Sequence, residues 1–174
     1  LEAEPEEGPG GRALILVDDD PLFRQMAGER LGQLGFRVIA CESVADGLAA
    51  VDREDAKGEA PALVADIVMP TTDSQGFLGG LELLEKLRRA HPEVKGVAVT
   101  AYPDESVREQ VGALGGELML KPGVGDASGL TEFFSRLAEL LGGEGAAARP
   151  GPAAGMPEVA PPSPSPAPPA AAAA

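Results

Sequence analysis

The chain has 174 residues, which is room for one domain of ordinary size with tails but not for two independent cores. Its 28 acidic and 14 basic side chains give a net charge of −14, which repels a phosphate backbone and argues against direct nucleic-acid binding. No apolar run is long enough to span a bilayer and the acidic start is unlike a signal peptide, so we expect a cytoplasmic protein without membrane contact.

Two residue types occur once each. Cys41 is the only cysteine, which excludes an internal disulfide and a cysteine-rich zinc site; we expect it to be a small buried residue at the end of a strand. His91 is the only histidine, so a histidine metal cluster or a Ser-His-Asp triad would depend on it alone. We expect His91 in a loop at the end of a helix.

Composition divides the chain into three parts. Residues 1–11 are acidic and poor in large apolar side chains, and residues 143–174 form a tract rich in Pro, Ala and Gly. Neither segment can offset the entropy of ordering by burying apolar surface, so both are predicted to be disordered. Residues 12–142 are predicted to form the domain.

Within that domain, short apolar runs alternate with stretches of helical period. The runs lie at 13–17, 36–40, 62–65, 96–100 and 117–121, and their nearly continuous apolar character predicts strands covered on both faces. The helices are indicated by Leu22, Met26, Leu31 and Leu34 after Pro21; by Val44, Leu48 and Val51 after an N-cap at Ser43; by Leu81, Leu83, Leu84 and Leu87; by Val107, Val111 and Leu114 after Pro103 and Asp104; and by Leu130, Phe133, Phe134, Leu137, Leu140 and Leu141. This alternation predicts an α/β fold, a doubly wound five-stranded parallel sheet with five helices.

Polar residues end or directly follow four of the predicted strands. They are Asp18-Asp19-Asp20, Asp66, Thr100 and Lys121. In a doubly wound sheet ligands bind beyond the carboxyl ends of the strands, so these side chains should share one crevice. Clustered carboxylates suit a hard cation such as Mg²⁺, and a carboxylate beside a metal, a lysine and a hydroxyl can take part in phosphoryl transfer.

Each of these residues has a plainer interpretation when it is read alone. Asp18 to Asp20 could form an N-cap cluster before Pro21, and we expect Asp20 to be such a cap. Asp66 could begin a turn, Thr100 could be an ordinary strand residue, and Lys121 could be a solvated loop charge.

Four segments together resemble the response-regulator receiver domains: LILVDDDP (14–21), ALVADIVMP (62–70), VAVTA (97–101) and LMLKP (118–122). The resemblance covers about residues 12–142 and implies the flavodoxin-like receiver fold of two-component signalling. It implies that Asp66 is the phosphoacceptor, and that Asp18, Asp19, Asp66 and the carbonyl of Val68 bind Mg²⁺. It further implies that Thr100 and Lys121 contact the phosphoryl group. The partner would be a histidine kinase or a histidine phosphotransfer protein, and the chain would be a signalling phosphoacceptor rather than an enzyme.

The sequence departs from the family pattern in two places. About six extra residues lie in the loop MPTTDSQGFLGGLELL after the acceptor motif, with Asp73 and Gly80 as candidates for its flanks. The extra length either alters partner access or is a tolerated surface insertion, since added loop length costs little stability. Leu118 stands where many relatives carry an aromatic residue that reports phosphorylation, so the transmission step should differ here.

Three other interpretations remain open. A haloacid-dehalogenase-like phosphatase would use the Asp18-Asp19-Asp20 segment, but it leaves Asp66 unexplained and prefers Thr or Val where Leu22 stands. A degenerate receiver that no longer accepts phosphate would lack site residues that are all present here. Because the first residue is Leu1, the chain could also be the receiver end of a hybrid histidine kinase.

Overall fold

The fold is an α/β sandwich, and the computed structural model describes residues 11–123 and 125–142. Its five parallel strands are β1 (Ala13–Val17), β2 (Arg37–Cys41), β3 (Ala62–Asp66), β4 (Lys95–Thr100) and β5 (Glu117–Leu120), in the order β2-β1-β3-β4-β5. The helices are α1 (Pro21–Gln33), α2 (Val44–Asp55), α3 (Gly79–Ala90), α4 (Glu105–Ala113) and α5 (Ala127–Leu140). The predicted fold class is confirmed. Apart from Gly11, the two segments expected to be disordered lie outside the described residues.

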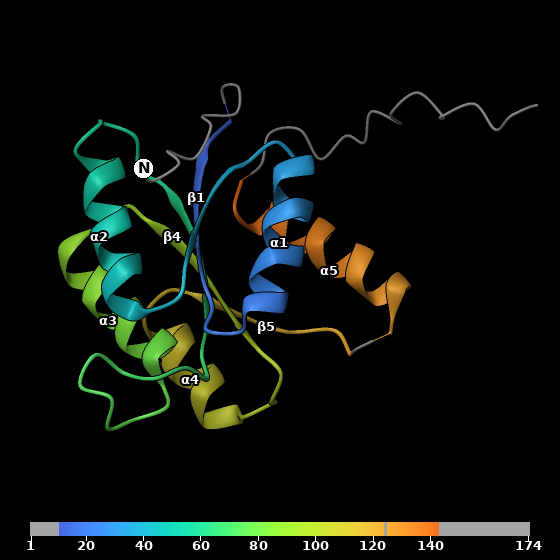
Figure 1. The fold of residues 1–174 in the computed structure, drawn as a ribbon. Helices are drawn as coiled ribbons and strands as arrows, with labels where there is room; N and C mark the ends of the chain where they lie inside the picture. The colour runs from blue at the N-terminus through green and yellow to red at the C-terminus, as the bar shows by residue number, and fades with distance from the viewer. Residues whose placement is uncertain (1–10, 124, 143–174) are drawn as a thin grey trace, which may run out of the picture.

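The helices form two layers. Figure 1 shows α1 and α5 on one face of the sheet and α2, α3 and α4 on the other. Along β1, Leu14 and Leu16 belong to the buried cluster with α1 and α5, whereas Ile15 and Val17 belong to the cluster with α2, α3 and α4. Successive strand side chains point to opposite faces, so a strand covered on both faces must be apolar throughout.

Burial falls from the middle of the sheet to its edges. Every residue of β1 and β3 is buried, whereas most of β2 and β5 is only half-buried or exposed. The prediction that all five strands are fully covered is therefore wrong for β2 and β5. These two strands each have a neighbour on one side only, and Leu120 at the end of β5 is 45% exposed.

Aspartate and serine side chains begin four of the helices; in α5 the carboxylate of Asp126 accepts a hydrogen bond from the backbone N–H of Gly129. The carboxylate of Asp20 accepts hydrogen bonds from the backbone N–H groups of Leu22 and Phe23, and Ser43 accepts one from Asp46. Asp104 caps α4 in the same way. The predicted caps at Asp20 and Ser43 are confirmed, because both satisfy N–H groups that have no partner inside the helix.

The apolar stripe of α1 differs from the predicted one. Leu22 is 77% exposed, and Phe23 packs against the cluster that contains Ala27 and Leu31. Leu22 lies nine residues before Leu31, a rotation of about 180° at 3.6 residues per turn, so the two point in opposite directions. Phe23, Ala27 and Leu31 follow the four-residue spacing that keeps side chains on one face.

The second strand begins one residue later than predicted. The backbone N–H of Phe36 donates to the carbonyl of Leu31 (3.1 Å), so Phe36 belongs to the turn after α1 although its ring is buried. At the other end, β2 includes Cys41, whose thiol is buried as expected. Burial raises the pKa of that thiol to about 11, which keeps it protonated and unreactive. Among the described residues no helix is both long and apolar enough to cross a membrane.

A buried acid that the sequence analysis did not identify joins α2 to the sheet. The residue Glu54 is 3% exposed and its carboxylate is paired with Arg37 at the start of β2 and with Lys57 (2.9 Å). The hydrogen bond from Arg37, helped by Lys57, holds the pKa of Glu54 below its ordinary value although burial acts in the opposite direction. The charged form of Glu54 therefore stabilises the fold.

We predict that Glu54→Gln lowers the free energy of unfolding at pH 7 by about 1–3 kcal/mol, the usual worth of hydrogen bonds to charged groups. The pKa of Glu54 in the folded protein lies below the unfolded value near 4.5. Its contribution to the free energy of unfolding is therefore complete at pH values above the unfolded pKa, and it is lost as the pH falls through the folded pKa. Urea unfolding at several pH values measures this. The exposed Glu85→Gln should change stability little at any pH, and an equal effect of both variants would contradict the prediction.

Candidate functional site

The candidate site lies at the carboxyl edge of the sheet. Asp18 follows β1, Asp66 ends β3, Thr100 ends β4 and Lys121 follows β5. The order of strands places β1, β3, β4 and β5 side by side, so four segments far apart in sequence end at one edge (Figure 1). The predicted convergence of these residues therefore follows from the parallel topology.

Three carboxylates meet at this edge. One oxygen from each of Asp18, Asp19 and Asp66 lies within 4.8 Å of the others. Asp18 is fully buried and Asp66 is 7% exposed, whereas Asp19 is exposed to solvent. Like charges at such separations repel strongly in a partly buried place, so the cluster requires a compensating cation.

Lys121 supplies one compensating charge. Its ammonium group lies 2.7 Å from a carboxylate oxygen of Asp18 and 3.1 Å from one of Asp66. The same nitrogen lies 4.1 Å from the centre of the Phe23 ring, a cation–π contact, and the Phe23 ring stacks on Phe134. The backbone N–H of Lys121 donates to the carbonyl of Thr100 (2.7 Å), which fixes the start of this segment.

The two buried carboxyl groups have perturbed acidities. Burial raises the pKa of Asp18 and of Asp66 above their ordinary values, while Lys121 beside both acts in the opposite direction. For Asp66 the neighbouring Asp18 raises the pKa further. A carboxylate in such a place is held at an energetic cost, which a second cation bound by the cluster would reduce.

The local backbone divides the aspartate triplet between two roles. Asp18 accepts a hydrogen bond from the N–H of Asp20 (2.9 Å), and its own N–H donates to the carbonyl of Cys41 (3.1 Å). These bonds turn Asp18 into the cluster, while the Asp20 side chain turns away to cap α1. The triplet is thus divided: Asp18 and Asp19 belong to the carboxylate cluster, and Asp20 is the N-cap residue of α1.

Val68 and Thr100 border the cluster. The N–H of Val68 donates to the Asp66 carboxylate (3.3 Å), which places the Val68 backbone against the acid. Thr100 is 2% exposed, and its hydroxyl is engaged with the backbone of Tyr102: it accepts from the N–H (3.2 Å) and donates to the carbonyl (3.3 Å). Every residue that the sequence placed at the site therefore lies at this edge.

The extra residues after β3 leave the sheet and return to it. Met69 and Leu78 form an isolated bridge, and the N–H of Gly79 donates to the carbonyl of Met69 (2.8 Å), so the two ends of the loop are joined. Outside this base, the Glu82 side chain accepts from the N–H (2.9 Å) and the hydroxyl (2.6 Å) of Thr72. The insertion is therefore a loop whose two ends are hydrogen-bonded to each other next to Asp66, and it does not lengthen a strand.

Gly80 shows how tightly this base packs. A Cβ atom on Gly80 would lie 2.0 Å from the carbonyl oxygen of Asp66 and 2.8 Å from the Cα of Ile67. Both are backbone atoms, so they cannot move aside as a flexible side chain can. Of the two flanks predicted for the loop, Gly80 marks this packed base, whereas Asp73 is exposed on the loop and accepts a hydrogen bond from Thr71 (2.7 Å).

Phe23 is the site residue that the sequence analysis missed. It was hidden among the apolar residues of α1, although its four-residue spacing from Ala27 was a usable signal. Its contact with Lys121 joins residues about a hundred positions apart, which no local pattern reveals. The Lys121 ammonium group therefore lies between the Phe23 ring and the carboxylates of Asp18 and Asp66.

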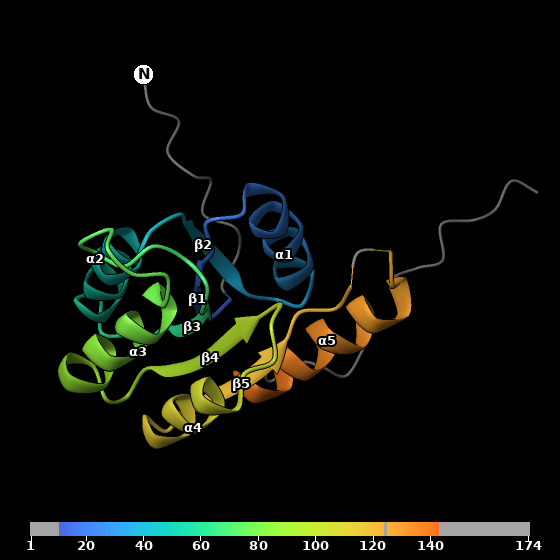
Figure 2. The ribbon, with the colours of Figure 1, turned by 90° about the horizontal axis from the view of Figure 1, so that it is seen from below.

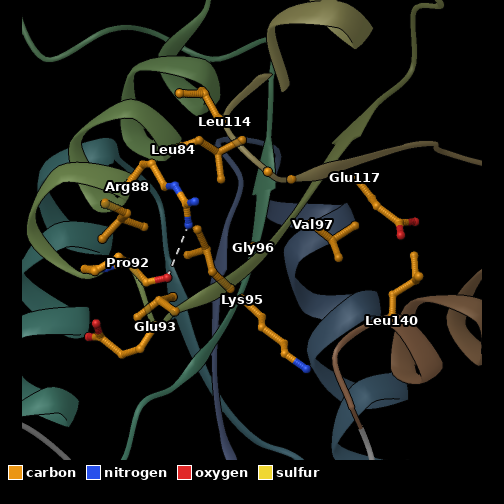
Figure 3. Close-up of a pocket in the computed structure, with 15 residues that line it drawn as sticks. Leu84, Arg88, Pro92, Glu93, Lys95, Gly96, Val97, Leu114, Glu117 and Leu140 are labelled. Atoms are coloured by element: carbon orange, nitrogen blue, oxygen red, sulfur yellow. Dashed lines mark hydrogen bonds between the residues drawn. The ribbon is translucent and has the colours of Figure 1, made fainter. Parts of the chain in front are cut away.

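A cavity at the opposite edge of the sheet is separate from this site. It measures about 390 Å³ and is lined by the ends of α3 and α4 and the starts of β4 and β5, including Leu84, Leu87 and Leu114. Figure 3 shows Arg88 reaching across it to the carbonyl of Pro92 (3.4 Å). None of the residues of the acidic cluster lines this cavity, and it carries no part of the chemistry described above.

Comparison with known proteins gives one family. The family described as "Response regulator receiver domain" matches residues 14–125. Among curated relatives, the sensor kinase CckA of Brucella abortus is 31% identical over 98 residues, which are 56% of this chain and 9% of that protein. The photosynthetic apparatus regulatory protein RegA of Rhodobacter capsulatus is 35% identical over 101 residues, or 58% of this chain and 50% of that protein. The chain thus spans half or less of the length of these relatives.

Solved structures agree on the fold. The CheY-like receiver domain protein of Methanospirillum hungatei JF-1 superposes with a TM-score of 0.57 at 24% identity, covering 75% of this chain and 97% of that one. The non-phosphorylated HemR receiver domain of Leptospira biflexa gives a TM-score of 0.60 at 24% identity, covering 75% and 94%. At 24% identity these similarities show a shared fold, that is, the same arrangement of strands and helices.

We predict that Gly80→Ala destabilises the protein by about 1–3 kcal/mol, because the added methyl group overlaps the backbone at Asp66. Gly28→Ala is the matched control: Gly28 also lies in a helix, but its Cβ would meet nothing within 4 Å. That variant should gain up to about 1 kcal/mol from helix propensity. Urea unfolding of both variants checks the contrast, and a Gly80→Ala variant as stable as Gly28→Ala would refute the packing argument.

Proposed function

The chain belongs to the response regulator receiver domain family, and on this premise we propose that Asp66 accepts a phosphoryl group in a Mg²⁺-dependent reaction. This family works in two-component signalling and not as ordinary enzymes. The donor would be a phosphohistidine on a histidine kinase or a histidine phosphotransfer protein. The product would be a phospho-aspartate whose presence changes contacts with other proteins.

One observation carries the proposal: Asp66 ends a central strand beside two further carboxylates, with the Lys121 ammonium 3.1 Å away. A carboxylate needed only to begin a turn would not require two further carboxylates and an ammonium group beside it. An Asp66 oxygen is the nucleophile; its bond to phosphorus forms while the bond from phosphorus to the donor's leaving atom breaks, and the electron pair departs with that atom.

The carboxylates of the cluster fit a hard divalent cation. Asp18, Asp19 and Asp66 offer oxygen atoms within 4.8 Å of one another, the donor type that Mg²⁺ prefers. These three side chains would hold the ion, together with the carbonyl of Val68. When bound, Mg²⁺ neutralises charge on the phosphoryl oxygens.

Lys121 and Thr100 have separate tasks in this proposal. Lys121 already lies beside Asp66 and pairs with the phosphoryl oxygens, so charge that develops there is met by a fixed cation. The Thr100 hydroxyl is engaged with Tyr102 and must leave that backbone before it can donate to a phosphoryl oxygen. Phosphorylation therefore rearranges the turn after β4.

The residue that follows this rearrangement in many relatives is aromatic, whereas Leu118 stands here. Leu118 is half-buried and packs against the cluster of α2, α3 and α4. We therefore expect phosphorylation to change the protein surface at the turn that contains Thr100 and Tyr102, whose side chain is 68% exposed. The phosphatase alternative is set aside, because the family match includes the segment of Asp66, which that alternative leaves unexplained.

We predict that acetyl phosphate with Mg²⁺ adds one phosphoryl group to this protein, and that Asp66→Asn abolishes the addition. The amide of asparagine is not a nucleophile comparable to a carboxylate. Intact-mass spectrometry measures the added mass. Asp73→Asn, which removes an exposed carboxylate on the neighbouring loop, should be labelled like wild type. Labelling of Asp66→Asn at the wild-type level would show that another residue is the acceptor.

Asp19 and Lys121 should affect different steps. Asp19→Ala is predicted to weaken Mg²⁺ binding at least tenfold, because it removes one of three clustered carboxylates. Lys121→Ala should bind Mg²⁺ as well as wild type or better, since it frees Asp18 and Asp66 from a competing cation, yet phosphorylation should slow by about 10²–10³-fold. Calorimetric titration and the rate of labelling separate the two effects. Equal Mg²⁺ affinity of Asp19→Ala and wild type would exclude the metal role of Asp19.

A further inference from the structure

A second cluster of side chains with metal-ligand atoms lies at the other end of the molecule. His91 follows α3 as its C-cap residue, as the sequence predicted, and faces Asp55 at the end of α2 and Glu93 two residues on. The helices return from the carboxyl edge of the sheet, so their last residues lie at the amino edge, away from Asp66. Both views show α2 beside α3 (Figures 1 and 2).

From this arrangement we propose that His91, Asp55 and Glu93 form a binding site for a divalent transition metal of the Zn²⁺ class. Nδ1 of His91 lies 3.5 Å from Oδ2 of Asp55 and 3.6 Å from Oε1 of Glu93. Zinc bonds of about 2.0–2.1 Å separate two tetrahedral ligands by about 3.3–3.4 Å. The imidazole nitrogen and each carboxylate are thus spaced almost as they would be around one ion.

The other imidazole nitrogen supports the assignment independently. Nε2 of His91 lies 2.8 Å from Oδ1 of Asp52, one turn before Asp55 on α2. With Nε2–H donating to Asp52, the ring presents the lone pair of Nδ1 to Asp55 and Glu93. A ligating histidine characteristically donates its second nitrogen to a carboxylate, which fixes the tautomer and the ring orientation.

The lone pair of Nδ1 and two carboxylates repel one another, so a positive charge belongs between them. A proton on Nδ1 or a metal ion can supply it, and the presence of two carboxylates at ligand spacing favours the ion. The imidazole is 13% exposed and fixed in place, whereas Asp55 and Glu93 are about half-exposed and free to close the remaining distance. Three protein ligands leave the fourth position of a tetrahedral ion to water. The bound ion would join the end of α2 to the segment between α3 and β4.

The uniqueness of His91 makes the test sharp. Wild-type protein in excess Mg²⁺ is titrated with Zn²⁺ by calorimetry and by NMR, where the only imidazole resonances of the chain are those of His91. We expect one Zn²⁺ bound with a shift of these resonances, and an affinity at least tenfold lower for His91→Gln and for Glu93→Gln. Asp52→Ala should weaken binding by about 10–100-fold, as the loss of a histidine's supporting carboxylate does.

Two controls separate this site from the acidic cluster. Glu85→Gln removes an exposed carboxylate from α3 and should leave Zn²⁺ affinity unchanged, and Asp19→Ala should leave the imidazole shift unchanged. Thermal midpoints measured without metal show whether each variant is folded. If His91→Gln is unfolded, Glu93→Gln replaces it in the test, because Glu93 lies in a turn outside the helices. Imidazole resonances that respond to pH but not to Zn²⁺ would mean that only a proton occupies the position, and would overturn the proposal. So would equal Zn²⁺ affinity in wild type and Glu93→Gln.

Discussion

Electrostatic repulsion among Asp18, Asp19 and Asp66 is the constraint around which the carboxyl edge of the sheet is built. Three carboxylates within 4.8 Å are tolerated because Lys121 contacts two of them and Phe23 holds the lysine from below. This balance depends on the register of parallel strands that bring distant segments to one edge. The apolar interior keeps the strands in register and so positions the charges indirectly.

Sequence reasoning succeeded where the determinant is local or topological. The continuous apolar runs predicted the strands because a strand covered on both faces has no polar side, and β1 and β3 show this at every position. Alternation of strands and helices then predicted the parallel topology, and this topology gathers Asp66, Thr100 and Lys121 at one edge. The caps at Asp20 and Ser43 were predictable because a cap acts within three residues of itself.

Sequence patterns did not predict the features that depend on a contact between distant segments. The pairing of Glu54 with Arg37 and the contact of Phe23 with Lys121 join segments whose distance in space no periodicity reports. The exposure of Leu22 follows from the rotational phase of α1, which the cap and the burial of Leu31 set together. The low burial of β2 and β5 was not predicted, because a strand's place at the edge of the sheet depends on the whole fold and not on its own sequence.

The closed base of the loop after β3 has a consequence for how this protein tolerates change. Met69 and Leu78 are bridged, so the chain leaves and re-enters the domain at adjacent points. Peptides of other lengths could be spliced between them without shifting the register of α3 or moving Gly80 from the Asp66 carbonyl. The loop is therefore a point at which a recognition sequence could be inserted beside an unaltered carboxylate cluster.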